Sequence, residues 1–260
     1  MLIGLFYWFV VGGILGSFFN VCIWRIPRHE SIVSPGSHCP KCQAAVKAYD
    51  NIPIISYLLL GGKCRSCREP ISIEYPLVEL LTALLFAATY YYYWPVSSSP
   101  LPFARSIVFL SLLVVISFID LHFQIIPNVL SYPGLLIGLL LGLGEFAGAD
   151  MLRLWATNYL LGALVGGGIL LLIALAYPGG TGFGDVKLTA MLGAFLGVKA
   201  VLTAIFLAYF LGALISLILI ALKIRSRRDA VPFGPFLSLG GFLSLYWGEL
   251  FISWYFHNFF

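Results

Sequence analysis

The chain has 260 residues, of which 60% are hydrophobic and 10% are charged, and its mean hydropathy is +0.97. Soluble domains carry about 25% charged residues, so this composition excludes an ordinary soluble protein and indicates one that is embedded in a membrane. The net charge of +4 is modest. No nucleic-acid partner is expected, because no large soluble domain carries this charge.

Eight apolar segments are candidates for membrane-spanning helices, and the sixth is the shortest. They are Leu2–Trp24, Pro76–Trp94, Pro102–Ile119, Ile125–Leu143, Trp155–Tyr177, Val186–Val198, Val201–Leu222 and Phe233–Phe256. The first lacks a basic n-region and a cleavage site, so it is not a removable signal. The sequence therefore predicts an all-α polytopic membrane protein with about eight transmembrane helices. It divides into a first helix (1–27), a small insertion (28–75) and a membrane core of about seven helices (76–260).

Basic residues are concentrated on one side of this predicted bundle. Seven lie in the segment 25–75 and four in the segment 223–232, whereas the opposite side carries Arg105, Arg153 and Lys199. Lys and Arg are enriched in cytoplasmic loops, so the richer side is expected to be cytoplasmic, with both termini on the other side. The basic cluster at 223–228 then serves as a topological anchor at the membrane surface.

Two aspartates at the ends of apolar segments are the candidate catalytic residues. Asp120 closes the third predicted span, and Asp185 opens the sixth, so both fall on the cytoplasmic side. Two spans lie between them, whereas an odd number would have put them about 30 Å apart. A carboxylate at the edge of hydrocarbon is costly, and two that share a proton are equipped to hydrolyse a peptide bond. For either aspartate alone, a helix cap or an interfacial charge is the better explanation, and only the shared side and the glycine-rich loop bring catalysis level with it.

The segment Tyr177–Gly184 is rich in glycine and is predicted to form a loop that leads into the sixth span. That span rises only roughly 20 Å, so its start is expected below the membrane surface. Irregular backbone is tolerated at this depth only where protein surrounds it. Gly182 and Gly184 are therefore predicted to line an active-site loop that an extended peptide substrate can approach closely.

Two C-x2-C pairs lie in the predicted insertion: Cys39 with Cys42, and Cys64 with Cys67. Four thiolates at this spacing can bind a zinc ion in tetrahedral geometry. A segment this small has too little hydrophobic core to fold without such a cross-link. Disulfides or free thiols are the alternative, although a reducing cytoplasm disfavours disulfides. Because cysteines fill the coordination shell, the zinc is expected to be structural and not hydrolytic.

Several motifs together resemble the type IV prepilin peptidases. They are the opening signature Gly16–Pro27, the two C-x2-C pairs, Tyr49–Pro53, Tyr75–Leu80, Phe118–Asp120 with Ile126–Asn128, the Gly-x-Gly-Asp motif 182–185, and Phe233–Leu237. They occur in the family's order from residue 16 to about residue 240. The resemblance implies a GxGD-type aspartic endopeptidase of the bacterial inner membrane, with Asp120 and Asp185 as catalytic residues. Such an enzyme removes the basic leader of type IV prepilins or type II secretion pseudopilins at the cytoplasmic face.

The resemblance also implies N-methylation of the newly exposed amino terminus with S-adenosyl-L-methionine. The sequence has no glycine-rich strand-to-helix turn of the Rossmann type. By resemblance, Gly62 and Lys63 are the candidates for this activity, although Gly62 equally suits a tight turn. Two alternatives stay open: the same peptidase without methyltransferase activity, and a proton- or cation-coupled transporter that uses the two acids. A missing inverted repeat and the position of both acids at one face argue against transport.

Overall fold

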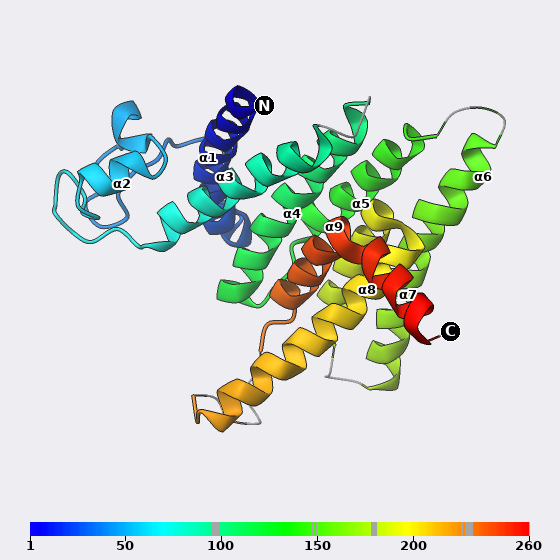
Figure 1. Cartoon of the computed structure of the whole chain (residues 1–260). Coiled ribbons are helices and arrows are strands. Elements are labelled where there is room, and N and C mark those ends of the chain that lie inside the picture. The colour runs from blue at the N-terminus through cyan, green and yellow to red at the C-terminus, as the bar shows by residue number, and fades with distance from the viewer. Residues whose placement is uncertain are drawn as a thin grey trace. The chain divides into compact units, whose positions relative to one another are not determined.

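The structure is a computed structural model that describes residues 1–94, 99–146, 148, 150–177, 181–224, 226 and 231–259. The chain forms two compact units, Met1–Val115 and Ile116–Phe260, and each is described by itself (Figure 1). All regular elements in the described residues are helices, and none of these residues forms a strand. The predicted all-α class is confirmed.

The first unit is built on two long helices, α1 (Leu2–Arg25) and α3 (Glu74–Tyr93), which pack against each other. Gly12 and Gly16 bring their backbones into contact. A Cβ atom on Gly12 would lie 2.7 Å from Cα of Ala83, and one on Gly16 would lie 2.7 Å from Cα of Glu79. Small residues four apart commonly permit such close packing of membrane helices. The segment between α1 and α3 contains η1 (Ile26–Arg28), η2 (Ala48–Asn51) and α2 (Ile55–Leu59).

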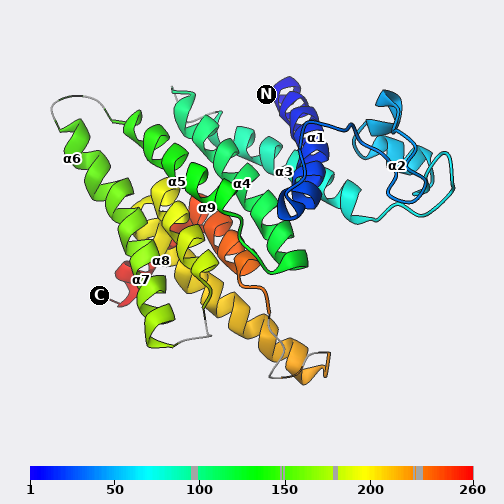
Figure 2. The same ribbon diagram turned by 180° about the vertical axis from the view of Figure 1, so that it is seen from behind.

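The second unit surrounds α8 (Phe183–Ala221), which contacts α5 (Asn128–Leu143), α7 (Leu161–Ala176) and α9 (Gly234–Phe259). Figure 2 shows these helices from behind. The unit also contains the end of α4 (Leu101–Phe123), and α6 (Met151–Trp155) and η3 (Ala156–Leu160) lead into α7. Glycines again permit contact between backbones: a Cβ atom on Gly193 would lie 2.1 Å from the carbonyl oxygen of Gly162. This packing fixes the start of α8, where Asp185 lies.

The 39 residues of α8 do not form one straight helix, because the helical backbone is interrupted at Gly197. Gly197 has φ +79° and ψ 177°, a conformation outside the helical region that glycine adopts without strain. A Cβ atom on Gly166 would lie 2.7 Å from the carbonyl oxygen of Thr189 and 2.9 Å from Cγ2 of Val201. Those two residues would be about 18 Å apart along a continuous helix. The chain therefore folds back at Gly197, and residues 183–196 and 198–221 form a helical hairpin.

Among the residues that the structure describes, four helices are long and apolar enough to cross a membrane: Leu2–Arg28, Leu101–Phe123, Met151–Ala176 and Phe183–Ala221. Helix α5 is a shorter apolar helix. Helices α3 and α9 coincide with the predicted second and eighth spans, and the hairpin of α8 supplies the sixth and seventh. Each of the eight predicted segments thus contains a helix, although residues 125–127 before α5 and Phe233 before α9 are not helical. The sixth predicted span begins at Phe183 instead of Val186. The turn between the sixth and seventh spans is at Gly197, and not at residues 199–200 as predicted. Arg225, Arg227 and Arg228 of the predicted basic anchor lie outside the described residues.

Candidate active site and metal centre

Asp120 lies in the last turn of α4 and is 5% exposed. Its Oδ2 atom accepts a hydrogen bond of 2.9 Å from the backbone N–H of Gly234, the first residue of α9. The first N–H groups of a helix have no partner within the helix, so a carboxylate is favoured there. A Cβ atom on Gly234 would lie 2.7 Å from Oδ2 of Asp120, so only glycine fits without a shift.

Asp185 lies in the first turn of α8 and is 9% exposed. Its Oδ2 atom accepts a hydrogen bond of 3.0 Å from the N–H of Gly182, and its own N–H donates to the carbonyl oxygen of Gly182 at 3.0 Å. This reciprocal pair caps the helix and fixes the orientation of the carboxylate. Asp120 and Asp185 are therefore each held on one oxygen by a backbone N–H at the start of a helix.

The end of α4 and the starts of α5, α8 and α9 meet at one end of the second unit (Figure 1). The Asp120 carboxylate is near enough to that of Asp185 for their like charges to repel each other. Lys187 of α8 donates a hydrogen bond to Oδ1 of Asn128, the first residue of α5. Gly184 packs against Ile126, which a Cβ atom at this glycine would approach to 3.1 Å.

The structure corrects the predicted extent of the glycine loop. Phe183 and Gly184 lie in the first turn of α8, because the helix begins as soon as Asp185 can cap it. Gly182 is the residue that precedes the helix and has an ordinary extended backbone with φ −82°. Gly184 allows α8 to approach Ile126 closely. Pro178, Gly179 and Gly180 lie outside the described residues.

Three residues at this end were not predicted as site residues. Gly234 was recognised only within a family motif, and Asn128 only as the end of another. Lys187 lies two residues after Asp185, within the predicted sixth span. The tertiary contact between Lys187 and Asn128, 59 residues apart, has no signal in local sequence patterns. The Phe-Gly-Pro motif itself is the signal that could have indicated Gly234.

The four predicted metal ligands come together in the first unit. Each of Cys39, Cys42, Cys64 and Cys67 offers a sulfur atom, and the four sulfurs all lie within 4.8 Å of one another. The Sγ atoms of Cys39 and Cys67 are 3.8 Å apart. Zn–S bonds of 2.3 Å in a tetrahedron imply S···S distances of about 3.8 Å. This donor set is therefore of the right kind and size to hold a metal ion.

The two cysteine pairs form matching turns. His38 pairs with Ala45 and Lys63 pairs with Pro70 in isolated antiparallel bridges that close each turn seven residues after it opens. The residue after the second cysteine has positive φ in both turns, 58° at Gln43 and 61° at Arg68. The N–H of Cys39 donates to the carbonyl oxygen of Ala44, and that of Cys64 donates to Glu69. Repetition of one turn geometry places the two pairs opposite each other.

Two of the four thiols, Cys64 and Cys67, ionise very differently because their surroundings differ. Backbone N–H groups of Cys67 and Ser66 point at the Cys64 thiol and lower its pKa to about 7, so this cysteine readily ionises. The N–H of Glu69 lowers the pKa of Cys67, but burial and the hydrogen bonds with the other three thiols outweigh it and raise that pKa to about 12. Four thiolates this close repel one another unless a cation compensates their charge.

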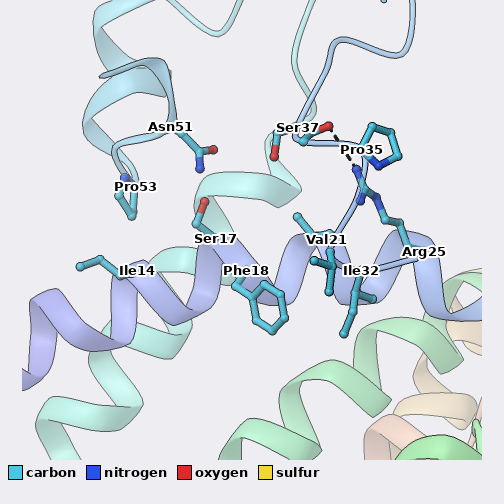
Figure 3. A pocket seen from close by; sticks show the side chains of 12 residues that line it. Ile14, Ser17, Phe18, Val21, Arg25, Ile32, Pro35, Ser37, Asn51 and Pro53 are labelled. Atoms are coloured by element: carbon cyan, nitrogen blue, oxygen red, sulfur yellow. Dashed lines mark hydrogen bonds between the residues drawn. The ribbon is translucent and has the colours of Figure 1, made fainter. Parts of the chain in front are cut away.

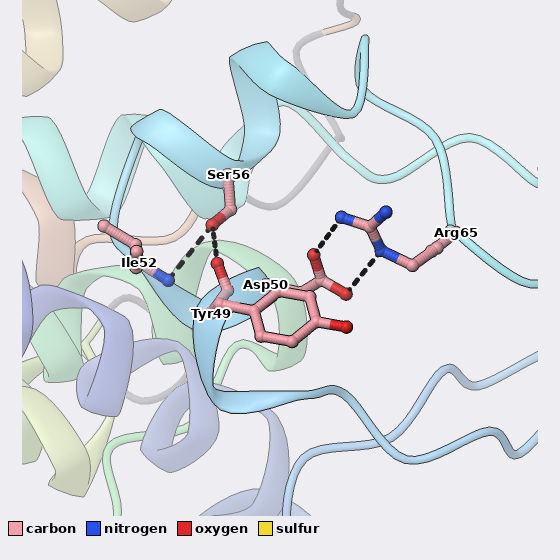
Figure 4. Close-up of polar contacts among 5 residues, drawn as sticks. All are labelled: Tyr49, Asp50, Ile52, Ser56 and Arg65. Atoms are coloured by element: carbon pink, nitrogen blue, oxygen red, sulfur yellow. Dashed lines mark hydrogen bonds and ion pairs between the residues drawn. The ribbon is translucent and has the colours of Figure 1, made fainter.

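The linker between the two turns is anchored by a bidentate ion pair (Figure 4). Arg65 donates from Nε to Oδ2 of Asp50 at 2.8 Å and from Nη2 to Oδ1 at 2.6 Å. The hydrogen bonds from Arg65 lower the pKa of the Asp50 carboxyl. Ser56 donates to the carbonyl oxygen of Tyr49 at 2.9 Å and accepts from the N–H of Ile52 at 3.1 Å. The second cysteine turn and the linker are thereby joined.

Gly62 and Lys63 directly precede the second cysteine turn. Gly62 has φ +67°, and a Cβ atom there would lie 3.0 Å from the hydroxyl of Tyr57. Its N–H donates to the carbonyl oxygen of Tyr57 at 2.9 Å, and its own carbonyl accepts from Ile71 at 2.7 Å. A tight turn thus accounts for the glycine, while Lys63 is exposed.

Comparisons with known proteins match both units. Residues 10–93 match the family model described as the bacterial peptidase A24 N-terminal domain, and residues 107–217 match that of the type IV leader peptidase family. The second match contains Asp120 and Asp185. No solved structure matches the chain.

Curated relatives extend this similarity over almost the whole chain. A protein of Bacillus subtilis is 38% identical over 95% of this chain and 96% of its own length. Proteins of Aeromonas hydrophila and Pseudomonas aeruginosa are 35% and 33% identical, over 96% and 92% of this chain and 93% and 89% of their own lengths. All three are named prepilin leader peptidase/N-methyltransferase. With a helical membrane fold and these matches, the chain belongs to the type IV leader peptidase family.

Proposed function

We propose that this chain is a membrane aspartic endopeptidase that cleaves the leader from type IV prepilins or type II secretion pseudopilins and then methylates the new amino terminus. The observation that carries the proposal is the pair Asp120 and Asp185. Both are buried, both are fixed by a backbone N–H, and their charges interact. The names of the relatives supply the substrate class.

In the proposed mechanism, the two carboxylates share the acid–base work. One is ionised and takes a proton from a bound water, while the other is protonated and donates to the scissile carbonyl oxygen or the departing amine. Oδ2 of each residue accepts a backbone N–H, from Gly234 in Asp120 and from Gly182 in Asp185, which leaves Oδ1 for water and substrate in this mechanism. A proton on one carboxylate favours ionisation of a like neighbour, which suits the division of roles in this mechanism.

The proposed location is the bacterial inner membrane, with both termini periplasmic and the active site and cysteine insertion at the cytoplasmic face. The excess of Lys and Arg in the segments 25–75 and 223–232 supports this orientation. The substrate's own hydrophobic helix lies in the same bilayer, which limits its leader to the membrane surface. The carboxylates of Asp120 and Asp185, placed near the membrane surface, would attract the positive charges of a basic leader.

Zinc is the metal that the four cysteines fit best, since tetrahedral thiolate sites favour it. Cys39, Cys42, Cys64 and Cys67 would hold it and join the two turns of the insertion. S-adenosyl-L-methionine would supply an electrophilic methyl group for the cleaved substrate's amine.

Reconstitution tests the whole proposal at once. The purified protein in lipid vesicles, given a prepilin and S-adenosyl-L-methionine, is expected to yield a product that has lost its leader and gained 14 Da (one CH₂), about the mass that N-methylation adds. Mass spectrometry reads both changes in the same sample. Cleavage without added mass would identify a peptidase that does not methylate, and an intact prepilin would contradict the proposal.

Gly234→Ala is expected to lower leader cleavage by about a hundredfold while the protein still folds. The added methyl group would meet Oδ2, Cγ and Cβ of Asp120 at 2.7–3.1 Å and displace the carboxylate from its position. Initial cleavage rates measure the effect. Gly168→Ala is the matched control, because nothing lies within 4 Å of a Cβ atom on this α7 glycine. Equal rates for the two variants would refute the role of Gly234.

Variants at Gly62 and Lys63 distinguish a loss of folding in the insertion from a loss of methyl transfer. Gly62→Ser is expected to destabilise the second cysteine turn by about 1–2 kcal/mol, because a side chain is strained at positive φ. Thermal unfolding and bound metal would report this loss. Lys63→Ala changes only an exposed side chain, so metal content should be retained. A lower methylated fraction in Lys63→Ala with full metal content would support a direct role in methyl transfer.

A further inference from the structure

A pocket of about 340 Å³ lies in the first unit, between one face of α1 and the insertion (Figure 3). Insertion residues between 32 and 37 and between 51 and 53 form one wall. The α1 side chains of the other wall recur at helical spacing, and they are Ile14, Ser17, Phe18, Val21 and Arg25. The pocket therefore follows one face of a predicted membrane-spanning helix from its middle to its last turn.

Arg25 supplies the charge of this pocket. The side chain is 6% exposed, and its Nη1 and Nη2 atoms donate to the carbonyl oxygens of Ser31 at 2.9 Å and Gly36 at 3.3 Å. Both acceptors are neutral, and within the described part of the chain no acidic side chain lines the pocket or forms an ion pair with Arg25. A guanidinium has five N–H donors, so three remain beyond these two bonds. A buried cation with spare donors favours an anionic partner, and the oxygens of a phosphate match its planar fork.

Exposed apolar side chains border the same pocket. Ile14 is 56% exposed and Phe18 is 44% exposed, although both lie within a helix that is long and apolar enough to span a membrane. Side chains on such a helix that protein does not cover contact the hydrocarbon of the bilayer. In Figure 3 the guanidinium of Arg25 reaches towards Ser37, whereas the ring of Phe18 points away from the insertion. The lining is therefore amphipathic, with a cation at one end and apolar groups that face lipid.

The distance between these two parts of the lining matches one half of a bilayer. Ile14 lies eleven residues before Arg25, which is roughly 16 Å along a helix. One leaflet contributes about 15 Å of hydrocarbon, half of the whole core. An acyl chain whose phosphate is bound at Arg25 would therefore end near Ile14.

A buried carboxylate holds the two walls of the pocket together. Oε2 of Glu79 accepts a hydrogen bond of 2.7 Å from the N–H of Ile54, and the Ser17 side chain hydrogen-bonds to the same carboxylate. Ile54 has φ +62° and ψ −51°, and the N–H of Ile55 donates to the carbonyl oxygen of Pro53 at 2.5 Å. This is a γ-turn of the strained kind, which persists only where its surroundings hold it. Glu79 thus joins Ser17 on α1 to the insertion beside Pro53, and the pocket between them is preformed.

From these features we propose that the pocket binds one anionic glycerophospholipid, with its phosphate on Arg25 and an acyl chain along Phe18 and Ile14. Basic pockets beside membrane-spanning helices are a recurring way to bind such headgroups. The lipid is anionic overall, because no acidic side chain in the described lining could pair with the ammonium group of a zwitterionic headgroup. The bound lipid contacts both α1 and the insertion and so joins them. Lipid binding here does not depend on the proposed peptidase or methyltransferase activity.

The test measures lipid binding to the purified full-length protein by native mass spectrometry, after detergent has removed the lipids that were purified with it. The two probes are phosphatidylglycerol and phosphatidylethanolamine with identical dioleoyl chains, so that only the headgroup differs. The protein is expected to bind one phosphatidylglycerol at least about tenfold more tightly than phosphatidylethanolamine, since only the former leaves the guanidinium facing a net negative charge. Equal affinity for the two lipids would overturn the proposal.

Arg25→Gln is expected to weaken binding of phosphatidylglycerol by about tenfold or more and to remove the preference for it, because the charge-assisted hydrogen bonds are lost. Arg28→Gln is the matched control. This exposed arginine lies near the same end of α1, with its guanidinium over the ring of Trp24, and does not line the pocket. It should keep the preference. An unchanged preference in Arg25→Gln, or equal losses in the two variants, would overturn the assignment of Arg25.

A second variant leaves Arg25 and its bonds to the loop in place. Val21→Trp puts a larger side chain at a half-buried position in the lining and fills part of the pocket. It is expected to weaken binding of phosphatidylglycerol at least about tenfold. Val10→Trp is the matched control, because this residue is 41% exposed on the same helix and does not line the pocket. Bound metal checks that the insertion folds in both variants, and unchanged affinity in Val21→Trp would refute the proposed site.

A soluble competitor separates a lipid from a small phosphate compound. Glycerophosphoglycerol is the headgroup of phosphatidylglycerol without its acyl chains, so it lacks the part that Ile14 and Phe18 contact. It is expected to displace phosphatidylglycerol only at a concentration at least about a hundredfold higher. Displacement at equal concentration would assign the pocket to a soluble phosphate compound and overturn the lipid. Leader cleavage, measured on the same preparations, tests the proposed peptidase separately: its absence would leave the lipid result intact.

Discussion

Asp120→Asn and Asp185→Asn are each expected to abolish leader cleavage, with a loss of at least about a thousandfold in initial rate. Each substitution removes one of the two groups that exchange a proton with water and substrate, and neither group can take both roles. The amide oxygen of asparagine still accepts the N–H that now bonds to Oδ2, so the starts of α8 and α9 should keep their structure. Loss of activity would therefore report chemistry and not unfolding.

The measurement is the initial rate of cleavage of a prepilin by each purified variant in vesicles, together with its thermal unfolding. Asp150→Asn is the control. This exposed aspartate directly precedes α6, after the end of α5 that is remote from Asn128. It should cleave at the wild-type rate. Full processing by either Asp120→Asn or Asp185→Asn would remove that residue from the mechanism. Activity retained in both would leave the proposed peptidase without its catalytic pair.

Replacement of Cys39 and Cys42 together by serine is expected to abolish metal binding and to unfold the insertion locally. Two thiolate ligands are lost from a site whose four sulfurs lie within 4.8 Å of one another. A structural zinc ion contributes about 10 kcal/mol or more to folding in small domains. The segment between α1 and α3 otherwise relies on short helices, one bidentate ion pair and backbone bridges.

Elemental analysis of the purified protein and limited proteolysis of the insertion measure these two effects. The Cys64→Ser and Cys67→Ser double variant should behave in the same way, since each turn supplies two ligands. Cys22→Ala is the control, because this cysteine is buried in α1 and is not part of the cluster. Full metal content in either double variant would rule out the four-cysteine site, and metal loss in Cys22→Ala would show that the assay reports general unfolding.

The locations of the helices were predictable from local sequence because apolar runs of sufficient length admit few other structures in a membrane. The four cysteines were predictable for a similar reason: ligand spacing within a C-x2-C turn is a local property, and the structure brings both turns together. The contacts that orient the aspartates were not. Gly234 lies 114 residues from Asp120, and the Phe-Gly-Pro motif marks this glycine without indicating that its partner is Asp120.

The sequence by itself determined the membrane class and the succession of apolar segments, and it singled out the four cysteines that the structure brings together and the two acids of the family resemblance. Only the tertiary structure decided that Gly197 folds α8 back on itself, that Gly184 belongs to a helix, and that Arg25 lies buried beside a pocket. The reason is physical: hydropathy and ligand spacing act along the chain over one turn or one span. A backbone N–H at the start of one helix, by contrast, acts on a carboxylate wherever packing brings the two together.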